Sequence, residues 1–141
     1  MNASHALLTP ILALVLWSLV VWLWMYVTRI PAIQKAGIAP DQAREPSSLD
    51  ALPLKVRQVA YNYNHLMEQP TIFYALVLYT YLATPQSELS VGLAWVYVGL
   101  RVVHSLVQAT TNVILLRFSI HVLGTLALFV LALRDVLAIA G

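Results

Sequence analysis

The most informative absence in this sequence is that of cysteine. None of the 141 residues is a cysteine. This excludes disulfide bonds, cysteine-ligated zinc or iron–sulfur clusters, and a catalytic thiol supplied by the protein itself. Any thiol chemistry carried out by this chain must therefore use sulfur that a substrate brings.

Charge is also scarce. Charged residues form 10% of the chain and apolar residues 60%, whereas soluble proteins have about 25% and roughly 45–50%. A net charge of +2 is too small to indicate a nucleic-acid partner. The composition therefore predicts an all-α membrane protein, a four-helix bundle that occupies residues 1–141 as one domain.

Long apolar runs give the expected membrane spans. They cover residues 6–27, 54–83, 89–108 and 118–139, each long enough for a bilayer. No Lys or Arg precedes Arg29, so the first run lacks the basic region of a signal peptide and is interpreted as a retained span. Pro70 lies inside the second run and predicts a kink there.

A polar, proline-rich stretch over residues 30–53 separates the first two spans. Four prolines and a glycine in and at the end of this stretch predict a loop. Basic residues lie within or beside it, and the positive-inside rule then places it in the cytoplasm. We therefore expect an inner-membrane protein with both termini outside the cytoplasm.

Ionisable and amide side chains within the spans gather toward the expected cytoplasmic half. Intramembrane polar groups are costly and are candidates for function. Helical spacing places Arg57, Tyr61, Asn64 and Glu68 on one face, with His65 three residues from Glu68. A second face carries Arg101, His104 and Gln108, while Arg117 and His121 open the last span.

Several arginines at one depth favour an anionic ligand, because guanidinium groups match carboxylates. The alternative is structural: Arg57, Arg101 and Arg117 extend to the membrane surface, and Glu68 pairs with Arg101 to join two helices. A similar depth on three helices favours a shared pocket over this alternative.

Two segments resemble signatures of the MAPEG superfamily, the membrane-associated proteins in eicosanoid and glutathione metabolism. One is the segment from His65 to Leu76, HLMEQPTIFYAL, and the other is RVVHSL from Arg101, followed by Asn112 and Arg117. The resemblance extends over nearly the whole chain. It implies a homotrimer of four-helix protomers that binds glutathione between neighbouring protomers.

The resemblance also implies roles for individual residues. Arg117 is the residue expected to stabilise the glutathione thiolate for attack on a small lipophilic electrophile that enters from membrane lipid. The residues expected to bind glutathione are Arg57, Asn64, His65, Glu68, Arg101, His104 and Gln108. Two positions depart from the family pattern: His65 stands where Asn is common, and Gln108 stands where glutathione-using members often have Tyr.

Two other functions remain open. The protein could be a non-catalytic member of the same fold that binds a lipid or an anionic metabolite, or that scaffolds a membrane partner; Gln108 favours this alternative. A haem or metal site on His65, His104 and His121 ranks last, because arginines are poor neighbours for such a site. We accordingly expect no metal.

Overall fold

The computed structural model describes residues 5–85 and 87–141, and all regular secondary structure in this part of the chain is helical. The elements are α1 (Leu8–Ala36), two short 3₁₀ helices η2 (Gln42–Arg44) and η3 (Pro46–Ala51), α2 (Leu54–Met67), α3 (Gln69–Ala83), α4 (Glu88–Ala109) and α5 (Ile114–Ala140). The expectation of an all-α protein is confirmed.

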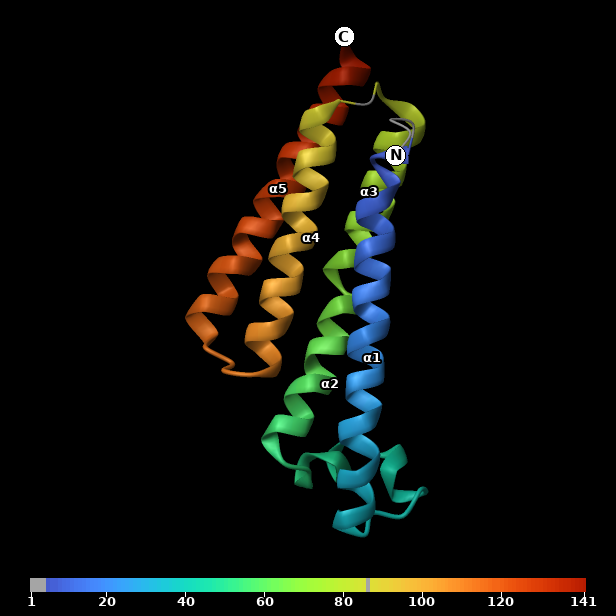
Figure 1. The fold of residues 1–141 in the computed structure, drawn as a ribbon, viewed down its shortest axis with the longest axis vertical. Helices are drawn as coiled ribbons and strands as arrows, with labels where there is room; N and C mark the ends of the chain where they lie inside the picture. The colour runs from blue at the N-terminus through green and yellow to red at the C-terminus, as the bar shows by residue number, and fades with distance from the viewer. Residues whose placement is uncertain (1–4, 86) are drawn as a thin grey trace.

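The helices run side by side along the long axis of the molecule (Figure 1). Helix α1 lies beside α2 and α3, and α4 lies beside α5. Helix α1 begins at the end of the molecule at which α5 finishes, and we call this the terminal end. At the opposite end, which we call the loop end, the last turns of α1 and the η2–η3 segment extend beyond the turn between α4 and α5.

Three helices, α1, α4 and α5, are individually long and apolar enough to cross a membrane. Their outer surfaces carry large apolar side chains that no other part of the chain covers, such as Leu16, Leu19, Phe129 and Leu133. Such exposure is costly in water but is the expected state of a lipid-facing surface. The molecule is therefore an integral membrane protein.

The second expected span is interrupted. The sequence predicted one helix over residues 54–83 with a kink at Pro70, whereas the structure ends α2 at Met67 and begins α3 at Gln69. Glu68 lies between them with non-helical φ and ψ of −90° and −97°. Pro70 lies in the first turn of α3, where its missing N–H costs least, and its ring would clash with the preceding turn of a continuous helix.

The first helix is longer than expected. It continues through Pro31 to Ala36, so the loop expected from residue 30 begins only at Gly37. Gly37 adopts a left-handed φ of 66°, and its N–H and that of Ile38 bond to carbonyls of the last turn, which ends the helix. Pro31 is exposed and therefore clashes with no neighbouring helix.

The apolar core lies in the half of the molecule toward the terminal end. Its largest members, all fully buried, are Leu7, Leu14, Phe73, Tyr97 and Leu131. The rings of Phe73 and Tyr97 stack with centroids 4.6 Å apart and so join α3 to α4. This packing fixes the helices from which the polar side chains project toward the loop end.

Candidate functional site

The buried face of α4 carries the first group of predicted site residues. Arg101 is 4% exposed, His104 5% and Gln108 2%. Their spacing of three and four residues places them on one side of the helix, as the sequence indicated. The chain therefore buries a cation and two further polar groups inside an apolar helical protein.

Arg101 is held by hydrogen bonds rather than by an ion pair. Its Nε donates to the Tyr97 hydroxyl at 3.0 Å, and one terminal nitrogen donates to Gln69 Oε1. The Tyr97 hydroxyl donates to the same Gln69 oxygen at 3.3 Å, and Gln69 Nε2 donates to Thr125 Oγ1 at 2.7 Å. These bonds tie α3, α4 and α5 together around the guanidinium.

Arg101 has no carboxylate partner within residues 5–85 and 87–141. Burial of an uncompensated charge is expensive, and neutral hydrogen bonds recover only part of the lost solvation. The site around Arg101 thus retains an excess of positive charge.

Three histidines lie next to each other beside Arg101. The rings of His65 and His104 have centroids 6.2 Å apart, and those of His104 and His121 are 6.1 Å apart. His65 Nδ1 lies 3.1 Å from a carboxylate oxygen of Glu68, at the break between α2 and α3. The structure therefore brings together predicted residues from α2, α4 and α5, although the described residues include no His, Asp and Glu group suited to a metal ion.

Arg117 lies where α5 leaves its turn from α4. It donates from one terminal nitrogen to Asn112 Oδ1. Asn112 adopts a left-handed φ of 52°, which Asn tolerates better than most residues, and this turn aims its side chain at α5. The Nε of Arg117 is buried and has no hydrogen-bond partner among the described residues.

Gln108 has an unpaired hydrogen-bond acceptor, whereas the unpaired group of Arg117 is a donor. Its Oε1 is buried and accepts no hydrogen bond from the described part of the chain. One turn toward the terminal end, Ser105 and Asn62 contact each other at 2.6 and 2.8 Å and link α4 to α2. We use the name anion cluster for the polar residues around Arg101 and Arg117, without Ser105 and Asn62. These are His65, Glu68, Gln69, Tyr97, Arg101, His104, Gln108, Arg117 and His121.

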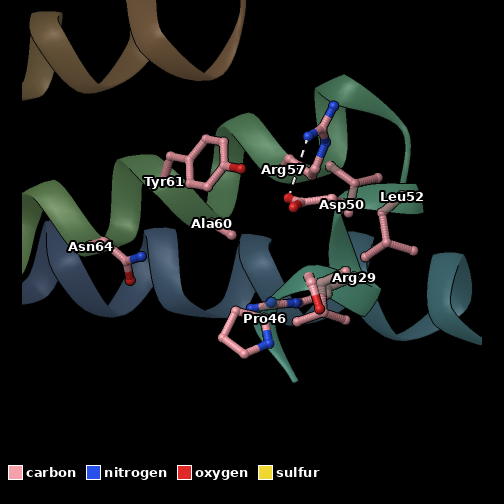
Figure 2. Close-up of a pocket in the computed structure, with 11 residues that line it drawn as sticks. Arg29, Pro46, Asp50, Leu52, Arg57, Ala60, Tyr61 and Asn64 are labelled. Carbon is pink, nitrogen blue, oxygen red and sulfur yellow. Dashed lines mark ion pairs between the residues drawn. The ribbon is translucent and has the colours of Figure 1, made fainter. Parts of the chain in front are cut away.

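Arg57 and Asn64 are the predicted site residues that lie elsewhere. They line a separate cavity of about 320 Å³ between α1, η3 and α2, which has no lining residue in common with the anion cluster (Figure 2). Glu68 does not line this cavity, although the sequence placed it on the face of Arg57 and Asn64. Glu68 lies one turn beyond Asn64, at the break between α2 and α3.

Gln69 was not predicted as a site residue. It lies between Glu68 and Pro70, and an amide next to a predicted site residue and a helix-disturbing proline was the available signal. Tyr97 was not predicted as a site residue either; its ring packs on Phe73, and its hydroxyl accepts a hydrogen bond from Arg101. Both roles depend on how α3 packs against α4.

An apolar groove adjoins the anion cluster. Its volume is about 270 Å³, and it lies between α3 and α5 with Gln69 and Thr125 at its polar boundary. The remaining wall is apolar and consists of Ile72, Leu76, Leu128, Phe129 and Ala132. The arrangement thus combines a cationic, hydrogen-bonding site with an adjoining surface suited to a lipophilic group.

These features define a helical membrane protein with a polar site inside its bundle. A comparison with known families matches residues 7–137 to the MAPEG family, and the chain belongs to that family. The family resemblance found in the sequence is thereby confirmed over nearly the whole chain. Neither a curated protein nor a solved structure matches the chain.

Proposed function

We propose that this protein is a glutathione-dependent transferase or peroxidase of the membrane. The observation that carries the proposal is the anion cluster, where Arg101 is buried without a carboxylate and Arg117 has a buried, unpaired Nε. An anionic ligand would compensate both. The MAPEG family includes glutathione-related transferases, which makes glutathione the first ligand to test.

In this proposal different residues of the anion cluster bind different groups of glutathione. Arg101, His104 and Gln108 hold carboxylate and amide groups of glutathione, while His65 and Glu68 contact its amine. Arg117 stabilises the thiolate, because a nearby cation favours the charged form of a thiol. The thiolate then forms a bond to the electrophilic carbon of a lipophile seated toward the Gln69–Thr125 groove, and the leaving group departs with the bonding electrons.

Two further features belong to the same proposal. The break at Glu68 leaves α2 and α3 each too short to span the bilayer, and together they form the fourth crossing. Glu68 and His65 are substantially exposed, with side-chain exposures of 66% and 40%. In a homotrimer a neighbouring protomer would cover these side chains and complete the glutathione site.

The orientation of the chain can be tested directly because it lacks cysteine. We propose a bacterial inner-membrane protein with the loop end in the cytoplasm. A single cysteine at Ser47 should then resist a membrane-impermeant maleimide in spheroplasts, whereas one at Ser87 should react. Labelling in the reverse pattern would invert this topology.

Titration with glutathione tests the activity itself. Purified protein should raise the ultraviolet absorbance of the thiolate at a pH where free glutathione is a thiol, and Arg117→Gln should abolish the rise. Arg44→Gln is the matched control, since Arg44 is an exposed arginine of the η2 helix. Native mass spectrometry of the same samples reports trimer formation and glutathione binding together. Absence of binding at millimolar glutathione would contradict the proposal.

A non-catalytic function is the second candidate. It is favoured by Gln108, which stands where many glutathione-using relatives have Tyr, and by Arg101, two of whose nitrogens already bond to Gln69 and Tyr97. Such a protein would bind a lipid or an anionic metabolite without turnover. A trimer that copurifies with lipid and shows neither a thiolate signal nor conjugation of an electrophile would favour it.

A further inference from the structure

The side chain of Gln69 joins three helices around Arg101. Gln69 is the first residue of α3 and follows the helix break at Glu68 directly. Its Oε1 accepts hydrogen bonds from Arg101 and from the Tyr97 hydroxyl on α4, and its Nε2 donates to Thr125 Oγ1 on α5 at 2.7 Å. Both lone pairs of the amide oxygen are therefore in use, and the amide is held from two sides.

Thr125 determines which way the amide of Gln69 points. The Thr125 hydroxyl donates its single hydrogen to the backbone carbonyl of His121 at 2.9 Å, so it acts toward Gln69 as an acceptor. The amide nitrogen of Gln69 therefore faces Thr125, and the amide oxygen faces Arg101. The guanidinium thus meets an acceptor that carries no charge.

The contacts of Arg101 use one edge of its guanidinium. Arg101 donates to Tyr97 through Nε and to Gln69 through Nη2, and these two nitrogens form the side edge of the group. Neither bond uses the end edge, which consists of Nη1 and the second hydrogen of Nη2. Two parallel N–H groups of this kind match the two oxygens of a carboxylate. Gln69 and Tyr97 therefore fix the plane of the guanidinium without occupying its end edge.

A carboxylate in place of this amide would act differently. Glutamate has the length of glutamine and would accept the same bonds from Arg101, but its charge would also compensate that of the guanidinium. The chain supplies such a partner at the terminal end, where Arg134 lies 3.3 Å from a carboxylate oxygen of Asp135. The neutral amide of Gln69 instead holds Arg101 and leaves its charge to act on a ligand.

We propose that Gln69 is a positioning residue that makes the anion cluster selective for a ligand carboxylate. It holds Arg101 by the side edge, and a carboxylate of the ligand bonds to the end edge. This inference rests on the proposed glutathione site, and it assigns one carboxylate of glutathione to Arg101. Gln69 thereby acts on the binding of the ligand, whereas the thiol is the part assigned to Arg117.

Calorimetric titration of the full chain in a neutral detergent tests this role. The first probe is S-methylglutathione, which keeps both carboxylates of glutathione but cannot form a thiolate. The second probe is the dimethyl ester of S-methylglutathione, which has no carboxylate. Wild-type protein should bind the ester at least about tenfold more weakly than the free acid, because the ester cannot form charge-assisted bonds with Arg101.

Three variants separate the charge of residue 69 from its hydrogen bonds. Gln69→Glu should weaken the binding of S-methylglutathione by about tenfold or more, because the new carboxylate compensates Arg101 and repels the ligand. Gln69→Met, which has a similar length and no acceptor of this strength, should weaken it by about threefold, because Arg101 keeps its charge but is no longer held. Gln34→Glu adds the same charge at an exposed site of α1 and should leave the affinity unchanged.

Two further measurements distinguish a positioning role from a purely structural one. In the conjugation assay Gln69→Glu should raise the KM for glutathione by the same factor as the dissociation constant and change kcat by less than about twofold, because only ligand binding is affected. The melting temperature of Gln69→Glu without ligand should be at or above the wild-type value, because the substitution gives Arg101 an ionic partner. A purely structural role would instead lower the melting temperature and leave the affinity of the folded protein unchanged.

Wild-type affinity for S-methylglutathione in folded Gln69→Glu would overturn the proposal. If size-exclusion profiles show that this variant does not fold, wild-type affinity in folded Gln69→Met would overturn it. Equal affinity of the wild-type protein for the free acid and its ester would do so as well. Binding that depends on Gln69, without a thiolate signal from glutathione, would support the role of Gln69 and contradict the transferase proposal. A thiolate signal together with unchanged affinity in Gln69→Glu would have the opposite meaning.

Discussion

The two ends of the bundle both bury charged residues, but they satisfy them differently. At the terminal end, Asp135 is 2% exposed and accepts hydrogen bonds from Thr80 Oγ1 at 2.6 Å and from Thr84 Oγ1 at 3.2 Å. Arg134 lies 3.3 Å from the same carboxylate and donates to the carbonyl of Pro85 at 2.6 Å. We call these four side chains, Thr80, Thr84, Arg134 and Asp135, the closed cluster.

The anion cluster differs from the closed cluster in what is left unpaired. Its Arg101 lacks a carboxylate, and buried atoms of Gln108 and Arg117 lack partners within the described residues. A fully bonded buried network stabilises one packing arrangement, whereas unpaired buried groups are costly and need a reason. The closed cluster therefore has a structural role, and the anion cluster is where we propose that a ligand binds.

In the sequence, the ionisable and amide side chains within the spans gather toward the expected cytoplasmic half. The structure shows a buried charge at the other end as well, because Asp135 is buried and joins α5 to α3. Charge alone thus does not distinguish a functional site from a structural one. The pairing of each polar atom does.

The largest expected effect concerns the anion cluster. Arg117→Gln should lower the rate of glutathione conjugation by about a hundredfold, since removal of one group that stabilises developing charge has effects of that size. Thermal stability in detergent should fall by no more than about 1–2 kcal/mol, because Arg117 loses only its bond to Asn112 while its Nε has no partner to lose. Initial rates with a chromogenic lipophilic electrophile measure the first quantity and a melting curve the second.

Arg44→Gln serves as the control for this experiment, since it removes an exposed charge outside the anion cluster. Wild-type rates in Arg117→Gln would show that Arg117 has no role in stabilising the thiolate. A strong loss of thermal stability together with activity would instead assign it to the packing of the α4–α5 turn.

In the closed cluster, a substitution should lower stability and leave glutathione binding unchanged. Asp135→Ala removes the charge-assisted bonds that join α5 to Thr80 and Thr84 and the ion pair with Arg134, and should cost about 2–3 kcal/mol of stability. Glutathione affinity should remain at the wild-type value. Unfolding in a series of detergent mixtures measures the first quantity, and unchanged stability would contradict the structural role of the closed cluster.

The comparison also shows what could be predicted from the sequence. The shared face of Arg101, His104 and Gln108 was predictable, because helical periodicity fixes which side chains lie on one side. The separation of Arg57 from these residues was not, because it depends on the way α1 and η3 fold over α2. The contacts of Gln69 were equally inaccessible, since they arise only when α3 packs against α4 and α5.

The ends of the helices were also only partly predictable from the sequence. Pro70 correctly marked a disturbance, but the local pattern could not distinguish a kink from the full break at Glu68. Pro31 and its neighbouring residues predicted a loop, whereas α1 continues to Ala36 because contacts with α2 and the Gly37 cap support it. Local signals located these positions, and tertiary packing decided their conformations.

A smaller effect sharpens the assignment of the closed cluster. Thr84→Val removes one hydroxyl donor of similar volume and should cost about 1 kcal/mol. Asp135 retains its shorter bond from Thr80, which explains why the loss should be smaller than that of Asp135→Ala. If Thr84→Val destabilised the protein as much as Asp135→Ala in the same unfolding assay, the network would depend on Thr84 rather than on the carboxylate.

The smallest expected change has the opposite sign and distinguishes the two clusters most directly. Gln108→Leu replaces a buried acceptor that has no partner by an apolar side chain of similar size. Without ligand it should raise stability by about 0.5–1 kcal/mol, because the cost of an unpaired buried oxygen disappears. With glutathione present the variant should gain less thermal stabilisation than wild type, since the ligand has lost a partner. A loss of stability in the absence of glutathione would place Gln108 in a satisfied network like that of Asp135, and the anion cluster would then no longer differ from the closed one at this position.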